Sequence, residues 1–204
     1  MLKIALNQYN NDWYKPGKTS IIRLLWYFTN SLVFQSSLFP VNTLKTRLLR
    51  LFGAIVGTGV VIKPGVNIKY PWRLCIGDHV WIGENAWIDN LANVQIGNHV
   101  CISQGAMLLT GSHNYKVKTF DLIVNDIVLE DGVWIGAHAV VCPGVRCHSH
   151  SVLSVSSVAT SDLSAYEIYQ GNPATSKRKR CTQADKSILD FEGEIAEALS
   201  IRQK

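Results

Sequence analysis

Two stretches of the chain, Ile76-Gly-Asp-His-Val-Trp-Ile-Gly-Glu-Asn-Ala86 and Ile96-Gly-Asn-His-Val-Cys-Ile-Ser-Gln-Gly-Ala106, lie over one another without a gap. In both, an aliphatic residue returns after six positions, and a small side chain follows it four places later. A step of six fits neither a helix face, whose period is 3.6, nor a long alternating strand, whose period is two. Each hexad therefore predicts one short strand followed by a tight turn.

The same step of six runs from Val56 to about Ser164. Its ladder positions are Val56, Ile62, Ile68, Ile76, Ile82, Ile88, Ile96, Ile102, Leu108, Leu129, Ile135, Val141, Cys147 and Leu153. This pattern predicts an all-β fold, a parallel β-helix of hexapeptide repeats in which three hexads close one triangular coil. The offset of twenty residues between the quoted stretches predicts two extra residues at one corner of the early coils. From Leu129 onward the hexads run without that insertion.

Length and composition fit one domain with flanking additions. The chain has 204 residues, a net charge of +5, 47% hydrophobic and only 17% charged residues, a composition that argues against wholesale disorder. The basic excess lies mainly before Ala54, where seven Lys or Arg stand against Asp12 alone. The five cysteines match no zinc spacing, and no secretory signal is visible, so we expect reduced thiols in a cytoplasmic protein.

We divide the chain into an arm (1–54), a β-helix domain (55–174) and a basic tail with a closing helix (175–204). The arm holds an apolar run, Ser20 to Phe39, that is short for a membrane span, and a basic amphipathic helix over 43–52. The arm either caps the open end of the β-helix or lies at an interface, where it touches anionic lipid or holds a lipid-linked acceptor. An insertion at 113–128 predicts a protruding loop.

Among six histidines, His113 stands where the regular ladder gives way to that loop. A neutral imidazole there suits general-base work near neutral pH, and a loop histidine satisfied by backbone is an equal alternative. His79, His99 and His138 occupy turn positions that point outward. His148 and His150 could pair on a metal, but we favour surface roles for them.

The ladder occurs together with four further motifs, which are Thr110-Gly-Ser-His113, Val133-Trp-Ile-Gly136, Pro143-Gly144-Val145 and Gly171-Asn-Pro-Ala174. Together they resemble the left-handed β-helix acyltransferases. More narrowly, they resemble the maltose, galactoside and nodulation O-acetyltransferase group and its colanic-acid-type exopolysaccharide branch. The resemblance implies a left-handed coil, a homotrimer with active sites between neighbouring chains, acetyl-CoA as co-substrate and no metal.

The resemblance also assigns residues. His113 matches the catalytic base, which takes the proton of an acceptor hydroxyl, with Asp89, Asp121 or Glu84 as suggested partners of its ring. Asn85 and Asn90 match acceptor contacts, although turn asparagines are the alternative for both. The positions that match the acetyl-CoA site are Trp134, Gly136, Ala137, Val155, Thr160, Gly171, Asn172, Pro173, Lys177 and Arg178.

The sequence therefore predicts an O-acetyltransferase that acts on a saccharide or lipid-linked saccharide of a cell-surface polysaccharide pathway. We expect it in the cytoplasm, and at the inner face of the membrane if the arm is interfacial rather than a cap, with no nucleic-acid partner. Three alternatives stay open, which are an N-acyltransferase on an amino sugar, a non-catalytic scaffold, and a metalloenzyme of the carbonic-anhydrase kind. The last would want a second histidine where Lys118 stands.

Overall fold

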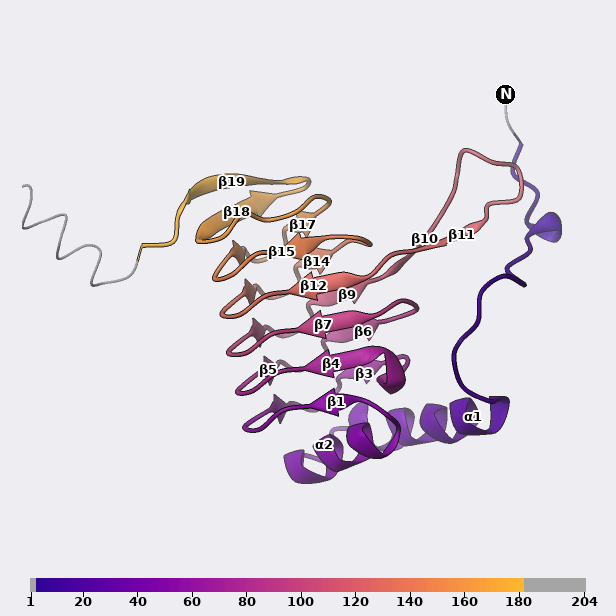
Figure 1. Cartoon of the computed structure of the whole chain (residues 1–204), viewed down its shortest axis with the longest axis horizontal. Coiled ribbons are helices and arrows are strands. Elements are labelled where there is room, and N and C mark those ends of the chain that lie inside the picture. The colour runs from indigo at the N-terminus through magenta and orange to yellow at the C-terminus, as the bar shows by residue number, and fades with distance from the viewer. Residues whose placement is uncertain (1–2, 182–204) are drawn as a thin grey trace, which may run out of the picture.

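The computed structural model describes residues 3–181, in which a stack of parallel coils follows two helices (Figure 1). The predicted helix at 185–203 lies outside these residues. Before the stack come η1 (Leu6–Gln8), α1 (Ser20–Thr29), the π-helix η2 (Asn30–Phe34) and α2 (Asn42–Leu51). The first coil also carries a short 3₁₀ helix, η3 (Pro71–Arg73).

Each coil contributes one strand to each of three sheets, as the hexads predict. The first sheet holds β1 (Ile55–Val56), β4 (Leu74–Ile76), β7 (Val94–Ile96), β12 (Ile127–Leu129) and β15 (Arg146–Cys147). The second holds β2 (Val61–Ile62), β5 (Trp81–Ile82), β8 (Cys101–Ile102), β13 (Trp134–Ile135), β16 (Val152–Leu153), β18 (Glu167–Gly171) and β19 (Ala174–Lys179). The third holds β3 (Asn67–Ile68), β6 (Trp87–Asp89), β9 (Met107–Leu109), β14 (Val140–Val141) and β17 (Val158–Ala159).

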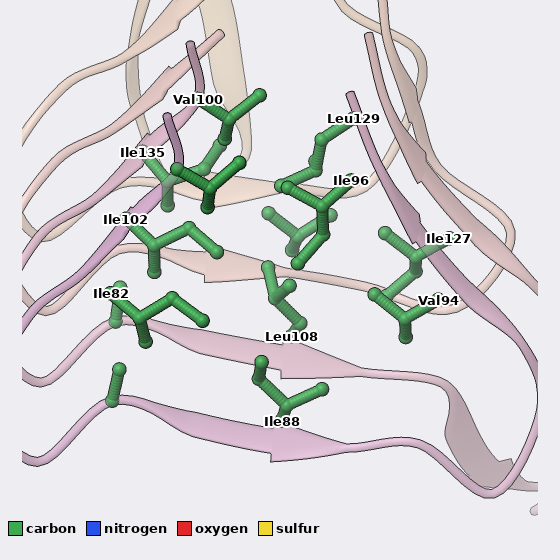
Figure 2. Close-up of a cluster of buried hydrophobic side chains, with 14 of the residues drawn as sticks. Ile82, Ile88, Val94, Ile96, Val100, Ile102, Leu108, Ile127, Leu129 and Ile135 are labelled. Carbon is green, nitrogen blue, oxygen red and sulfur yellow. The ribbon is translucent and has the colours of Figure 1, made fainter. Parts of the chain in front are cut away.

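The ladder residues form the core. Figure 2 shows Ile82, Ile102 and Ile135 stacked in one column, and each is almost fully buried. Their sequence neighbours Trp81 and Trp134 point outward and are exposed, because successive side chains of a strand alternate between faces. The prediction of a β-helix from the step of six is therefore confirmed.

Extra residues leave the coil at one corner, between the third sheet and the first. Ile55 pairs with Cys75, an offset of twenty, whereas Leu129 pairs with Cys147, an offset of eighteen. Between β7 and β12 the offset is 33, as Ile96 pairs with Leu129. The two-residue insertion and the longer one therefore use the same corner, which confirms the predicted change of repeat length.

Exposed turns join the strands at the other corners. His79, His99 and His138 adopt left-handed backbone conformations with φ of 55–56°, and all three are exposed. His79 and His99 stack on each other with ring centroids 5.2 Å apart. These histidines belong to the turns, as their spacing predicts.

The helices lie across the open end of the first coil (Figure 1). Trp26 is buried and donates from Nε1 to the carbonyl of Ile68 at 2.8 Å. Lys45 is fully buried and donates from Nζ to the carbonyl of Lys63 at 3.0 Å, and burial lowers the pKa of its amine. The arm thus supplies partners for backbone groups that no earlier coil can pair, which favours the capping interpretation.

One carboxylate ties two coils together at the corner between the first and second sheets. Glu130 accepts hydrogen bonds from Arg146 at 3.1 Å, from His148 at 3.0 Å and from the amide and hydroxyl of Ser149 at 2.9 and 3.0 Å. Desolvation would raise the pKa of Glu130, but the hydrogen bonds from Ser149 and Arg146 outweigh it and lower the pKa to about 2.

We expect Glu130→Gln to lower the free energy of unfolding at pH 7 by roughly 1 kcal/mol, as for a well-bonded but partly exposed charge. Because the pKa of Glu130 is lower in the folded state, its charge stabilises the fold fully at pH values above the ordinary pKa of 4.5. This stabilisation is lost as the pH falls towards the folded-state pKa of about 2. The difference between wild type and variant should therefore shrink over that range. Urea unfolding at several pH values measures it, with exposed Glu84→Gln as control. Equal stability of both proteins at pH 7 would contradict the expectation.

Candidate active site

A hairpin leaves the stack after the third coil and carries His113 (Figure 1). Its strands β10 (Gly111–His113) and β11 (Leu122–Val124) pair antiparallel, so that His113 lies opposite Leu122. The protrusion thus begins at Gly111, two residues before the predicted start of the loop, because the residues before His113 already belong to this pairing. The ladder resumes with β12 at Ile127.

Two aromatic residues contact the ring of His113. Its Nδ1 lies 2.9 Å from the carbonyl oxygen of Phe120, and the two rings stack with centroids 4.5 Å apart. Tyr9 of the arm approaches the imidazole at 5.7 Å. A carbonyl can only accept, so Nδ1 must carry the hydrogen, and in the neutral imidazole Nε2 then keeps its lone pair.

The partner of the His113 ring is therefore a main-chain carbonyl. The sequence suggested Asp89, Asp121 or Glu84 for this role, and none of the three occupies it. Asp89 instead forms an ion pair with Lys69 at 3.0 Å on the third sheet. Sequence spacing gave no signal for Phe120, because the contact depends on the turn between β10 and β11.

A second feature is a groove of about 560 Å³ on the outer face of the second sheet. Five of the ten residues predicted for the acetyl-CoA site line it, and they are Trp134, Gly136, Ala137, Val155 and Arg178. The remaining lining comes from Ser103, Gln104, Val152, Leu153, Ser154, Ile168 and Arg180. A lining that combines apolar side chains with two arginines suits a long, partly apolar ligand that carries phosphates.

Close packing between coils fixes the floor of this groove. Trp134 is about half exposed, and its Nε1 donates to the hydroxyl of Ser103 at 2.9 Å. A side chain at Gly136 would meet the backbone nitrogen of Val155 at 2.6 Å, so only glycine allows the next coil to approach this closely. Arg180 is held by the carbonyls of Gly132 and His150.

The other five predicted acetyl-CoA residues do not line the groove. Thr160 follows β17 of the third sheet and is exposed. Gly171, Asn172 and Pro173 form the exposed turn of the β18–β19 hairpin, where Gly171 has a φ of +107°. Lys177 is exposed on β19. None of these five residues is therefore part of the groove lining in this chain.

The two asparagines predicted to contact the acceptor lie apart and differ in exposure. Asn85 is an exposed turn residue with φ of 57°, and it lines a cavity of about 280 Å³ with Gln35 and Glu84. Asn90 is fully buried, and its side chain bonds both the amide and the carbonyl of Tyr70. The amide of Asn90 is thus already used to hold the corner of the coil.

The chain is 35% identical over 164 residues to the putative colanic acid biosynthesis acetyltransferase of Escherichia coli, an alignment that covers 80% of this chain and 90% of that protein. It is 30% identical over 129 residues to the galactoside O-acetyltransferase of Escherichia coli, covering 62% and 64% of the two chains. No model of a protein family matches.

The chain belongs to the hexapeptide-repeat acetyltransferases, which fold as left-handed β-helices. A solved structure supports this, the hexapeptide-repeat acetyltransferase of Vibrio cholerae complexed with acetyl coenzyme A. It superposes with a TM-score of 0.73 at 25% identity and covers 87% of this chain and 96% of that one.

As an acetyltransferase, the chain has site features that its sequence did not reveal. Phe120 and Tyr9 hold the imidazole of His113, and Arg180 and Ser103 line the groove. Tyr9 lies 104 positions before His113 and has no motif of its own. Arg180 alone had a signal, since it ends the basic run that includes Arg178, but the run did not tell which members turn toward the groove.

We expect Arg178→Ala to weaken binding of coenzyme A by roughly 5- to 10-fold, because one charge-assisted contact to a phosphate is lost. Lys177→Ala is the matched control, since that side chain does not line the groove. Calorimetric titration with coenzyme A, and with a pantetheine fragment that lacks the nucleotide phosphates, measures the effect. The fragment should bind both variants as it binds wild type. If Lys177→Ala lost more affinity for coenzyme A than Arg178→Ala, Lys177 rather than Arg178 would be the residue that contacts the phosphates.

Proposed function

We propose that this acetyltransferase transfers the acetyl group of acetyl-CoA to a hydroxyl of a saccharide, in the biosynthesis of an exopolysaccharide or another cell-surface polysaccharide. The observation that carries the proposal is the orientation of His113, whose Nδ1 is fixed on the carbonyl of Phe120 so that Nε2 keeps its lone pair. The names of its relatives support the acceptor class, since they include colanic acid and galactoside acetyltransferases.

The groove on the second sheet is our candidate site for acetyl-CoA. Trp134 and Val155 offer exposed apolar surface to the pantetheine arm, and Arg178 and Arg180 offer positive charge to the phosphates. The related enzyme from Vibrio cholerae was solved with acetyl coenzyme A, which supports the same co-substrate here.

In the proposed reaction, Nε2 of His113 takes the proton of the acceptor hydroxyl as its oxygen attacks the thioester carbonyl. The tetrahedral intermediate then collapses, the carbon–sulfur bond breaks, and the proton returns from His113 to the leaving thiolate of CoA. The carbonyl of Phe120 stabilises the imidazolium formed between these steps, because it accepts from Nδ1 throughout. The products are an O-acetyl saccharide and CoA.

His113 is not among the residues that line the groove of its own chain. The hairpin extends away from the stack (Figure 1), so we propose that it completes the groove of a neighbouring chain in a homotrimer. A site shared between chains would explain why the base and the co-substrate groove occupy separate parts of one chain. The cytoplasmic location stays a prediction.

The metalloenzyme alternative has little support in residues 3–181. Nowhere in that range do three or more His, Cys, Asp or Glu side chains gather where they could hold a metal ion. His148, one of the suggested metal pair, bonds Glu130, while His150 stacks on Tyr166 at 4.8 Å. The two imidazoles therefore have separate partners.

We expect His113→Ala to lower kcat for acetyl transfer by about 10²- to 10⁴-fold, the usual contribution of a general base. Binding of acetyl-CoA should change little, because His113 does not line the groove. Thiol release over a panel of sugars, amino sugars and glycolipid extracts measures the effect, with the exposed turn variant His138→Ala as control. Transfer that survives in His113→Ala would refute the assigned base, and transfer only to amino sugars would favour the N-acyltransferase.

Complementation tests the shared site. We expect a mixture of His113→Ala, which keeps an intact groove, and Ala137→Trp, which fills the groove but keeps the base, to regain activity that neither variant has alone. Each site is active only where the base comes from an Ala137→Trp chain and the groove from a His113→Ala chain. If the chains mix at random in a closed ring, this is one of four equally frequent pairings, so roughly a quarter of wild-type activity should return. The proteins are refolded together and assayed for thiol release. No recovery, in mixed trimers verified by mass, would place base and groove in one chain.

A further inference from the structure

The helix formed by α1 and η2 carries large apolar residues on two opposite sides. Trp26, Asn30 and Phe34 follow one another at intervals of four and face the first coil, where all three are buried. Asn30 bonds the side chain of Asn67 at 2.7 Å and accepts from the amide of Ile68 at 3.2 Å. These contacts fix this side of the helix on the first coil.

The opposite side carries a second apolar stripe that nothing in the described chain covers. Its members share one helical face, at positions i, i+3, i+4, i+7 and i+11, and are each 52–72% exposed; they are Ile21, Leu24, Leu25, Phe28 and Leu32. The segment after the helix adds Leu38 and Val41, which are also exposed. A surface helix normally presents polar residues to water, so an exposed stripe of this size marks a contact surface.

Positive charge near the stripe favours an anionic partner. From Trp13 to Gly77 the sequence holds nine Lys or Arg and no Asp or Glu. Of these, Lys18 is exposed just before α1, and Arg47 is exposed on α2. A second copy of the chain would bring the same positive charge to the contact and be repelled, whereas an anionic lipid surface would be attracted.

We propose that the outer face of α1 and η2 docks on an anionic membrane surface, with the apolar stripe inserted between the lipid headgroups. None of the helices within residues 3–181 has the length and hydropathy needed to cross a bilayer, and the arrangement fits a helix that lies in the plane of the interface. Docking itself is independent of the acetyl transfer proposed above. Its consequence, that a lipid-linked saccharide is met at the membrane, rests on that proposed function.

The test uses the full chain and two kinds of vesicle, one of phosphatidylcholine alone and one with about a third phosphatidylglycerol. In co-sedimentation, we expect the affinity of the wild type for the anionic vesicles to be at least 10-fold higher than for the neutral ones. This difference in affinity should fall as the salt concentration is raised. The double variant Leu25→Gln with Phe28→Gln should lose at least 10-fold of that binding. The matched control, Tyr115→Gln with Tyr166→Gln, removes exposed aromatic surface elsewhere and should bind as wild type does.

Circular dichroism and coenzyme A titration verify that each variant is folded, and thiol release with a soluble acceptor tests the transferase separately. Retained transfer with lost vesicle binding in the stripe variant supports docking. Absence of wild-type binding to anionic vesicles, or equal binding by the stripe variant, would overturn it. A change of oligomeric state in the stripe variant, measured by light scattering, would also overturn it, because the stripe would then be an interface between copies.

Discussion

The stacking of aliphatic side chains inside the coil is the constraint on which the rest of the structure depends. Ile82, Ile102 and Ile135 can bury their side chains only if each coil repeats its strands in register with the one below. Residues beyond the eighteen of a plain coil must therefore leave the stack without moving the strands. In this chain they all leave at the corner between the third sheet and the first.

That corner explains where the chemistry lies. Two extra residues there form small turns in the early coils, and fifteen more form the hairpin with His113. Because its ends are fixed by β9 and β12, the hairpin can project a base from a rigid support while its own turn supplies the carbonyl of Phe120. Trp134, in contrast, belongs to a strand of the second sheet, so the position of its side chain is set by the register of the coils.

This difference decides how much could be predicted from the sequence. The ladder, the change of repeat length and the place of the hairpin follow from periodicity, because one short-range rule repeats over many coils. Asn90 shows where that rule stops, since no spacing reveals that its side chain bonds the backbone of Tyr70 one coil below. Likewise, the basic run near Arg178 has no internal pattern, and only the fold of β19 against β18 tells which cations reach the groove.

The arm supplies to the first coil the hydrogen-bond partners that every other coil finds in its neighbour. The first coil has no neighbour below it, and Lys45 and Trp26 donate to its carbonyls, which would otherwise lack partners. That requirement explains the buried side of α1. It gives no reason for Leu25 and Phe28 on the other side, where exposed apolar surface contributes nothing to the cap. Apolar residues on two sides of one short helix thus imply two separate contacts. Residues 13–77 include Lys and Arg but no Asp or Glu, so the second contact favours an anionic partner.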